Sequence, residues 1–349
     1  MPNDNNTEDE KLKVQKSKFN YNKLIRIICA LGFVIFSALF IDDVFIQPLR
    51  MNKVVDMTRD LYLPSVTPTS VGTNAPQVTA APNLTSVPNV DSNRDEYGIL
   101  LKFSDLLQKN EDTKGWITFP DTNIDYVVMQ NSEDRDFYLT HDFMKEKQKA
   151  GCLFLDANSS VEENTKNLLI FGHNMKSTNN MFHALEHMKK LEYLKTHTVF
   201  SFDTLYQIGQ WKIFSIFITP GSDEKEPFFD FTRSRFDNDS DYLNFIYQLR
   251  NRSIFNFNSV DINENDQIVT LCTCTYEIND YRLVICARKV REGESPTVVA
   301  KSIKKNSHPL YPELYYKIYG GKAPKLPNTF EEANRKGLIH WYKRDNTSK

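Results

Sequence analysis

Cysteine is scarce in this chain, with five in 349 residues. Cys29 lies in an apolar run near the N-terminus, and the other four are Cys152, Cys272, Cys274 and Cys286. Small secreted domains that depend on disulfides carry a denser and more regular set of cysteines. The spacing here does not indicate a disulfide scaffold, so the thiols outside the apolar run favour a catalytic explanation.

An excess of positive charge is also lacking. Lys and Arg together number 43 and Asp and Glu together number 45, which gives a formal net charge of −2. Bulk electrostatics therefore does not indicate a nucleic-acid partner, and none is expected. Hydrophobic residues make up 40% of the chain, enough to support a core, and the length would allow two domains.

A long hydrophobic run, KLIRIICALGFVIFSALFIDD, occupies residues 23–43, and residues 27–41 carry no charge. With Arg26 extending its charge toward the interface, the run is about long enough to cross a bilayer. A buried core helix is one alternative. A cleaved signal peptide is another, although SALFIDD lacks the small residues of a good cleavage site. The run predicts a retained transmembrane anchor over residues 24–43.

The charges on either side of this run predict its orientation. The basic residues before it or near its start are Lys11, Lys13, Lys16, Lys18, Lys23 and Arg26. Asp42 and Asp43 follow it. The positive-inside rule then leaves residues 1–23 in the cytoplasm and the chain after about residue 43 outside the cell membrane.

Residues 44–94 are predicted to form an extracellular stalk or linker. From Thr67 to Asn93 the composition is dominated by Thr, Ser, Pro, Val and Asn, without apolar periodicity. Such composition is typical of an extended, flexible segment. The sequon Asn83-Leu84-Thr85 lies within it, but this short pattern is too common by chance to carry weight.

Order is predicted over residues 95–292. Apolar residues at helical spacing predict an amphipathic helix over 96–110, and further helices are expected at 181–190 and 240–250. Short apolar runs between turn signals predict strands at 115–119, 126–130, 151–155, 167–171, 198–202, 206–218, 267–274 and 282–290. About eight strands with few helices indicate a mainly β fold, a closed or nearly closed β-barrel.

Residues 293–349 form a basic, aromatic-rich C-terminal extension of unknown role. Its aromatic residues include Tyr311, Tyr315, Tyr316, Tyr319 and Trp341. A small packed appendage and a surface segment that touches the wall or membrane are both open. We favour a solvated, partly helical extension without a catalytic role.

The stretch TLCTCTYEINDYRLVI places Cys272 and Cys274 two positions apart in a predicted strand. Side chains two apart in a strand lie on one face, with their Cβ atoms roughly 6–7 Å apart. A disulfide needs about 3.8 Å between Cβ atoms, so a redox pair would distort the strand. Zinc sites need a second pair of ligands that the neighbourhood does not offer. No metal and no organic cofactor is expected.

A nucleophilic cysteine at the end of a strand is the remaining functional interpretation. It needs a base or a positive field, because the thiolate carries out the chemistry. Arg282 begins the next predicted strand, so hairpin pairing would return its guanidinium beside Cys274. That group donates hydrogen bonds to an oxyanion or a substrate carbonyl, but from spacing alone a surface arginine is the simpler interpretation.

A histidine should supply the base, and the chain has seven. His183 and His187 fall on a polar helix face, His197 precedes a strand, and all three are expected to be solvated. The remaining histidines in loops or the tail are His141, His308 and His340. His173 differs, because in NLLIFGHNM it follows a buried strand and a glycine, where a side chain reaches a barrel rim.

Three separated motifs resemble the sortases, and class B among them. TLCTC with an arginine at the head of the next strand is similar to the family's TLxTC…R signature. LLIFGHNMKSTNNMFHALEHM resembles the histidine segment of class B, and KGWITFPDTNIDYVVMQ its opening strands. The helix at 240–250, between the sixth and seventh strands, also fits class B. The resemblance covers about residues 96–292 and implies an eight-stranded sortase-type β-barrel.

Sortases are membrane-anchored cysteine transpeptidases of Gram-positive bacteria. The resemblance implies that Cys274 is the nucleophile, His173 the general acid/base and Arg282 the residue that stabilises the oxyanion or positions substrate. It further implies protein substrates with a C-terminal sorting signal, cleavage after threonine through a thioacyl intermediate, and transfer to an amine of a peptidoglycan precursor or cross-bridge.

Some features depart from the family or stay open. Cys272 stands at a variable position that is often serine in class B, and the extension after Val290 has no counterpart. Cys272, Asn174 and Thr275 are candidate substrate-binding residues by proximity alone. An exported cysteine hydrolase, a pilin-polymerising enzyme with a lysine acceptor, and a non-enzymatic surface-binding module are the alternatives.

Overall fold

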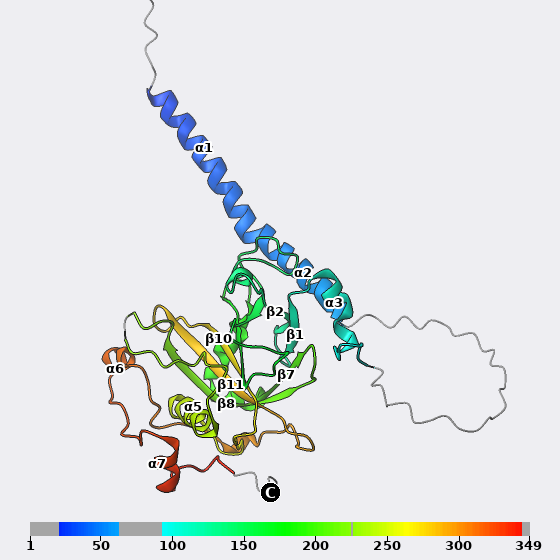
Figure 1. Cartoon of the computed structure of the whole chain (residues 1–349). Helices are drawn as coiled ribbons and strands as arrows, with labels where there is room; N and C mark the ends of the chain where they lie inside the picture. Colours follow the sequence, from blue (N-terminus) through cyan, green and yellow to red (C-terminus); the bar gives the residue numbers. More distant parts are fainter. Residues whose placement is uncertain (1–20, 63–92, 225, 344–349) are drawn as a thin grey trace, which may run out of the picture. The chain divides into compact units, whose positions relative to one another are not determined.

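The computed structural model describes residues 21–62, 93–224 and 226–343 (Figure 1). The chain divides into two units, residues 1–49 and residues 50–349. The predicted cytoplasmic segment falls outside the described residues except for its last three positions. Most of the predicted stalk, including the sequon at Asn83, also falls outside them.

The first unit contains α1 (Tyr21–Ile41), the π-helical turn η1 (Asp42–Ile46) and the start of α2 (Gln47–Tyr62). The helical stretch Tyr21–Tyr62 includes an 18-residue window with a mean hydropathy of 2.6, and none of that window is buried. The alternative of a buried core helix is therefore not supported. By length and composition the helix could span a membrane or act as a signal sequence.

The second unit is built on a closed eight-stranded barrel, as the sequence predicted. Its strands are β1 (Thr113–Thr118), β2 (Asp125–Met129), β3 (Leu153–Leu155), β4 (Asn167–Phe171), β7 (Val199–Thr204), β8 (Gln210–Pro220), β10 (Ile268–Cys274) and β11 (Tyr281–Lys289). The order around the barrel is β1-β2-β3-β4-β10-β11-β8-β7. The pairs β2–β3 and β4–β10 are parallel and the others antiparallel.

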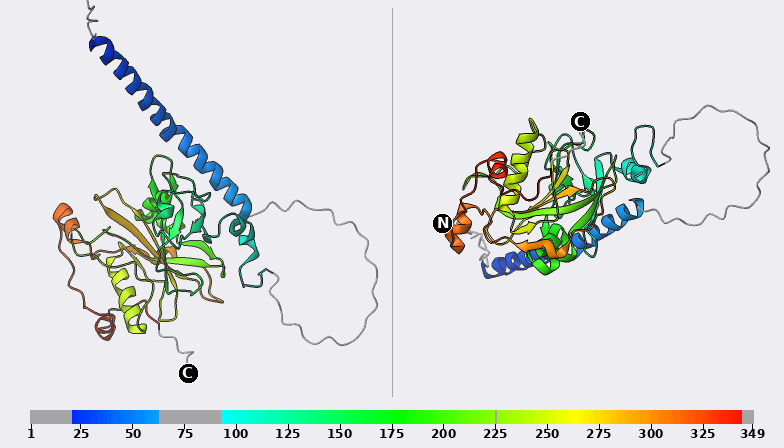
Figure 2. Two further views of the ribbon diagram at one scale, coloured as in Figure 1. Left: turned by 45° about the horizontal axis from the view of Figure 1, so that its top comes forward. Right: turned by 90° about the horizontal axis from the view of Figure 1, so that it is seen from below.

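Helix α5 (Asp239–Arg252) covers one side of the barrel, which explains why ten consecutive residues of β8 are buried (Figures 1 and 2). Asn238 caps α5 by accepting a hydrogen bond from the backbone N–H of Asp241. The Ser215 hydroxyl donates to the Leu249 carbonyl at 2.7 Å and fixes the helix on the strand. The predicted helix over 240–250 is confirmed.

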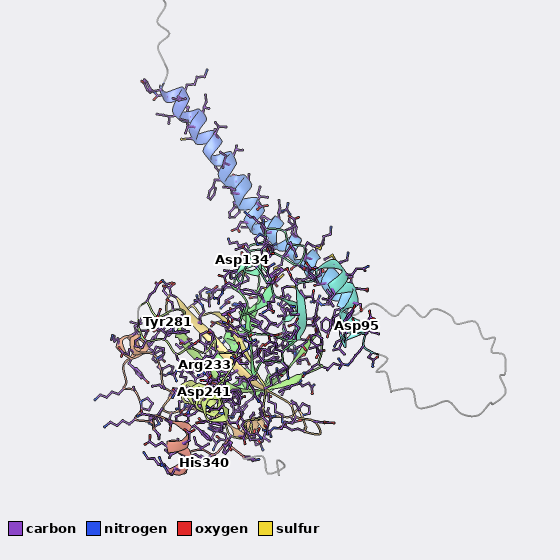
Figure 3. The ribbon with its side chains drawn as sticks, in the orientation of Figure 1. Asp95, Asp134, Arg233, Asp241, Tyr281 and His340 are labelled. Atoms are coloured by element: carbon purple, nitrogen blue, oxygen red, sulfur yellow. The ribbon has the colours of Figure 1, made fainter. Side chains whose placement is uncertain are left out.

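The other two helix predictions were partly wrong. In place of a helix over 96–110, the chain makes a turn and then the 3-10 segment η2 (Leu101–Phe103) and α3 (Ser104–Lys109). Gly98, at φ +77°, and the Asp95 carboxylate, which accepts from the Ile99 N–H at 2.8 Å, stabilise that turn (Asp95 is labelled in Figure 3). The predicted helix at 181–190 is the 3-10 helix η4 (Phe182–Lys189), followed by α4 (Leu191–Thr196).

Short elements complete the second unit. They are η3 (Phe137–Leu139), the pair β5 (Asn174–Met175) and β6 (Asn180–Met181), β9 (Phe255–Phe257), η5 (Ala300–Ser302), β12 (Ile303–Lys305), α6 (Glu313–Tyr319) and α7 (Phe330–Arg335). Strand β12 pairs with β9.

The segment predicted as a linker begins with an ordered helix. Residues 50–62 of α2 pack on the barrel, where Tyr62 stacks on Trp116 with ring centroids 4.4 Å apart. The Tyr62 hydroxyl donates to Asp203 at 2.9 Å, and Arg59 pairs with Asp125 at 2.6 Å. The sequence did not reveal this contact, because α2 is more polar than the barrel strands.

The C-terminal extension is also packed, and our preference for a solvated tail was wrong. Ile303, Phe330, Ala333 and Trp341 are buried in the main hydrophobic core. Burial of a large apolar side chain contributes about 1.5–3 kcal/mol, so Ile303, Phe330 and Trp341 stabilise the packed position of this segment.

Glu294 lies just beyond residue 292, where we placed the end of the catalytic domain, and it completes a buried ion pair. Arg288, fully buried, donates through both terminal nitrogens to the two Glu294 oxygens at 2.7 Å, and Lys212 pairs with the same carboxylate at 2.5 Å. Burial alone would raise the pKa of Glu294, but the hydrogen bonds from Arg288 and Lys212 outweigh it and hold that pKa well below its usual range.

Glu294→Gln is expected to destabilise the second unit by about 3 kcal/mol at pH 7, because the buried Arg288 charge loses its close carboxylate partner and keeps only Asp261, 3.9 Å away. The folded-state pKa of Glu294 is lowered, so its contribution is present above the unfolded pKa of about 4.3 and is lost as the pH falls below it. Urea unfolding at pH 7 and at pH 4 measures both effects, with the exposed Glu292→Gln as the control. Equal stability of the two variants at pH 7 would contradict this assignment.

Candidate active site

Strands β4 and β10 end, and β11 begins, at one rim of the barrel, where the candidate catalytic residues lie. Phe171 of β4 lies beside Cys272 of β10, and the Gly172 N–H donates to the Cys272 carbonyl at 3.1 Å. The Thr273 hydroxyl donates to the Gly172 carbonyl at 2.7 Å. Because the two strands run parallel, continuing this register by two residues brings His173 beside Cys274.

The third residue comes from the hairpin partner. Cys274 is the last residue of β10, and its cross-strand partner in β11 is Arg282. Opposite residues in an antiparallel pair have Cβ atoms about 4.5–5.5 Å apart, so the Arg282 and Cys274 side chains leave the sheet side by side. The hairpin register predicted from the spacing of Cys274 and Arg282 is therefore present.

The two cysteines of TLCTC differ in exposure. Cys274 is exposed at the end of β10. Cys272 is 1% exposed, and burial raises the pKa of its thiol well above the ordinary value. Since reactive thiols are accessible and ionisable, Cys274 is the better candidate for a nucleophile.

His173 is held by a backbone contact across the rim. Its Nε2 lies 2.9 Å from the Leu139 carbonyl, which only accepts, so Nε2 carries the proton in this arrangement. The Nδ1 atom is then the one left for proton exchange. Within the described residues the imidazole and the Cys274 thiol share no hydrogen bond, and catalytic contacts often tighten only when substrate binds.

Asn174 fixes the rim between these residues. Its side-chain amide donates to the Cys274 carbonyl at 2.8 Å, and its backbone carbonyl accepts from the Tyr276 hydroxyl at 2.6 Å. The His183 Nδ1 lies 2.6 Å from the Asn174 side-chain oxygen. His183, which we expected to be solvated, is thus part of this network, and burial followed by the neighbouring His187 lowers its pKa.

The structure does not place the candidate substrate-binding residues on an open surface. Cys272, Asn174 and Thr275 are 1%, 6% and 5% exposed. The Thr275 N–H donates to the Tyr281 carbonyl at 3.1 Å, and its hydroxyl accepts from Lys189 at 3.3 Å. All three side chains contact the protein itself, so their placement favours support of the rim over contact with a peptide.

Gly221 gives the Arg282 side chain its space. A Cβ atom at position 221 would lie 2.9 Å from the Arg282 Cζ and 2.8 Å from the Asp280 carbonyl oxygen. Both separations are too short for carbon, so the guanidinium rests against a backbone that only glycine leaves open. The sequence offered no sign of this contact, because residues 221 and 282 meet only through the pairing of β8 with β11.

Gly221→Ala is expected to lower kcat/KM for a peptide substrate about 10- to 100-fold, because displacing a positioning group by about 1 Å costs that much. Reaction of Cys274 with iodoacetamide, which needs no guanidinium, should change little. Steady-state kinetics and alkylation rates measure the two effects, with Ser222→Ala at the exposed neighbouring position as the control. Unchanged kcat/KM in Gly221→Ala would show that Arg282 does not need this position.

No group of three or more His, Cys, Asp or Glu side chains is placed to hold a metal ion within residues 21–62, 93–224 and 226–343.

Comparisons with known proteins point to one family. The Sortase domain family model matches residues 117–290. Sortase B of Listeria monocytogenes is 33% identical over 189 residues, which are 53% of this chain and 73% of that protein. Sortase B of Staphylococcus aureus is 30% identical over 192 residues, which are 54% of this chain and 75% of that protein.

A solved structure extends the likeness to three dimensions. Sortase B of Bacillus anthracis in complex with AAEK1 superposes with a TM-score of 0.56 at 26% identity, over 71% of this chain and all of that one. The chain therefore belongs to the sortase family of cysteine transpeptidases. Within the family it is a class B sortase, as the motifs in the sequence predicted.

Proposed function

We propose that this chain is a membrane-anchored transpeptidase that cleaves a C-terminal sorting motif after threonine and transfers the protein to a cell-wall amine. The observation that carries the proposal is the meeting of exposed Cys274, half-buried His173 and half-buried Arg282 at the ends of three adjacent strands. These are the residue types that acyl transfer through a thioester requires: a nucleophile, an acid/base and an oxyanion donor.

In the first half-reaction the Cys274 thiolate, whose proton has passed to His173, attacks the threonine carbonyl carbon of the sorting motif. Arg282 donates hydrogen bonds to the oxyanion that forms, and the tetrahedral species then loses the amine of the following residue. His173 gives that amine its proton, which leaves a thioester on Cys274 and a neutral imidazole. The free C-terminal fragment departs.

In the second half-reaction a primary amine attacks the thioester. His173 takes the proton that the attacking nitrogen loses, and the Cys274 thiolate departs as the new amide bond forms. The histidine thus acts as an acid first and as a base second, which is the order in which each form is available. An amine of a peptidoglycan precursor or cross-bridge is the proposed acceptor.

The proposed location is the cell membrane, with residues 1–23 in the cytoplasm and the barrel outside. The apolar window within Tyr21–Tyr62 supports a span, and Lys23 and Arg26 at its start support this orientation. Residues 24–43 would be the anchor, residues 95–292 the principal part of the catalytic domain, and the C-terminal extension a packed addition to it.

Product analysis separates transfer from hydrolysis. Sorting-motif peptides are incubated with residues 50–349, with and without candidate amines, and the products are identified by mass. We expect an amine-ligated peptide that depends on Cys274. Hydrolysed peptide alone with every amine would favour an exported cysteine hydrolase, and ligation only to a lysine side chain would favour a pilin-polymerising enzyme.

A further inference from the structure

The C-terminal extension brings α6 to the turn that joins the two catalytic strands. Figures 1 and 2 show α6 beside the tip of the β10–β11 hairpin. The Leu314 backbone N–H at the start of α6 donates to Glu226 at 3.2 Å. The Tyr319 hydroxyl at its end lies 3.4 Å from the Glu277 carbonyl, within the turn itself. The extension therefore contacts the catalytic hairpin directly through Tyr319 and indirectly, by way of Glu226, through Leu314.

Glu226 joins α6 to the start of β11. One carboxylate oxygen accepts from Leu314, and the other accepts from the hydroxyl of Tyr281, the residue labelled at this end of the barrel in Figure 3. Tyr281 is 2% exposed and immediately precedes Arg282. Burial, followed by the Glu226 contact, raises the pKa of Tyr281, so the phenol stays a hydrogen-bond donor at neutral pH.

The turn between the two catalytic residues is itself tightly held. The Thr275 N–H donates to the Tyr281 carbonyl at 3.1 Å, and the Gly221 N–H donates to the Asp280 carbonyl at 2.8 Å. Ile278 at the middle of the turn is 6% exposed. Because residues 275–281 are the direct chain connection between Cys274 and Arg282, movement of the turn changes the placement of both.

The opposite side of the turn is held by η4. Lys189 pairs with Glu277 at 2.7 Å and with Glu186 at 2.5 Å, and it donates to the Thr275 hydroxyl at 3.3 Å. The turn is thus bound on one side by a helix that belongs to the barrel and on the other by the C-terminal extension. Of these two contacts, the one made by the C-terminal extension comes from outside the segment that matches the family model.

We propose that α6, acting through Glu226 and the 275–281 turn, is a positioning element that fixes Arg282 relative to Cys274 for the acyl-transfer step. The proposal rests on the proposed function, in which Arg282 stabilises the oxyanion. Neither Glu226 nor Leu314 touches the reacting atoms; they act through Tyr281 and the turn. A carboxylate that bridges two elements holds each of them to the other, which neither contact alone would do.

Two observables separate positioning from simple loss of stability. The first is hydrogen exchange of residues 275–281, which reports opening of the turn whether or not the enzyme turns over. The second is the comparison of peptide acylation, which uses Arg282, with iodoacetamide alkylation of Cys274, which does not. A merely structural role would leave the ratio of the two rates unchanged.

The variants isolate each contact, all in residues 50–349. Glu226→Ala removes both hydrogen bonds, while Glu226→Gln keeps an acceptor and is the rescue variant. Leu314→Pro removes the backbone donor in the first turn of α6, where proline is tolerated, and Leu314→Ala keeps that donor as its matched control. Glu224→Ala, at an exposed position two residues from Glu226, controls for the loop.

We expect Glu226→Ala to lower kcat for peptide acylation about 10- to 100-fold with a smaller change in KM, because misplacement of about 1 Å has that cost. Turn exchange should rise roughly 10-fold, alkylation should change less than about threefold, and Glu226→Gln should recover most of the rate. The kcat of Leu314→Pro for peptide acylation should lie between those of wild type and Glu226→Ala. The kcat of Leu314→Ala should be close to that of wild type.

Unchanged turn exchange in both Glu226→Ala and Leu314→Pro would overturn the positioning role, and so would equal losses of acylation and alkylation. Wild-type protein that is acylated by no sorting-motif peptide would instead contradict the proposed function. In that case the exchange measurement still decides whether α6 holds the turn.

Discussion

Replacing Cys274 with alanine is expected to reduce turnover of sorting-motif peptides by roughly 10⁴-fold or more. The side chain is the proposed nucleophile, and loss of a nucleophile leaves only binding and the oxyanion donor to act on the peptide. Cys274 is exposed at the end of β10, so its loss creates no cavity. Initial rates of peptide cleavage, together with a thermal unfolding curve, measure the effect on activity and on stability separately.

Cys272→Ala is the matched control, because it removes a thiol two residues away in the same strand. Cys272 is 1% exposed in the core, so the variant should retain activity within a few-fold while losing about 1–2 kcal/mol of stability. Cys274→Ala should therefore lose activity and keep its stability, while Cys272→Ala should lose stability and keep most of its activity. Activity that survives Cys274→Ala and is lost in Cys272→Ala would contradict the assignment of the nucleophile.

His173→Gln carries the second-largest expected effect, a fall of about 10³-fold in kcat, since general acid–base catalysis contributes roughly 10²–10⁴-fold. Glutamine keeps a donor for the Leu139 carbonyl, which accepts from His173 at 2.9 Å, but it cannot exchange a proton with the substrate. The pH dependence of kcat should also lose its acid–base limb. Steady-state rates between about pH 5 and 10 measure both changes.

His183→Gln is the control for this variant. His183 contacts Asn174 and not the proposed reacting atoms, so a loss of less than about 10-fold is expected, with the pH profile retained. An equal loss in the two variants, or a His173→Gln enzyme with the wild-type pH profile, would show that His173 is not the acid/base.

The barrel could be predicted from the sequence because its strands carry a strong local pattern. Continuous apolar runs such as Asn167–Phe171 are typical of strands buried on both faces, and β4 has those bounds. The ends of the strands were less certain, since pairing decides them: β8 begins at Gln210, four residues after the predicted start. Local pattern fixes the kind of element better than its limits.

The rim was predictable only as far as it depends on strand register. The hairpin spacing predicted Arg282 beside Cys274, and Gly-His after a buried strand predicted a rim position for His173. The parallel pairing of β4 with β10, which brings His173 to Cys274, was not predicted from the residues alone. Contacts between side chains distant in sequence were out of reach. Asn174 and Thr275 were proposed to bind substrate by proximity, but both are buried against the protein.

The C-terminal extension shows why composition alone misled. Its lysines and tyrosines indicated a solvated segment, but Phe330 and Trp341 insert into the core beside α5 and the barrel. A few apolar side chains at irregular spacing are enough to anchor a segment when they fit an apolar surface that the rest of the protein provides. Pattern-based prediction does not see that surface.

The most direct test of the account is the site of the acyl adduct on residues 50–349. The protein is incubated with sorting-motif peptides without an amine, quenched in acid, digested and mapped by mass spectrometry, with Cys274→Ala treated in parallel. We expect a peptide attached through its threonine carbonyl to Cys274 and no adduct in the variant. An adduct on Cys272, or one that persists in Cys274→Ala, would contradict this expectation.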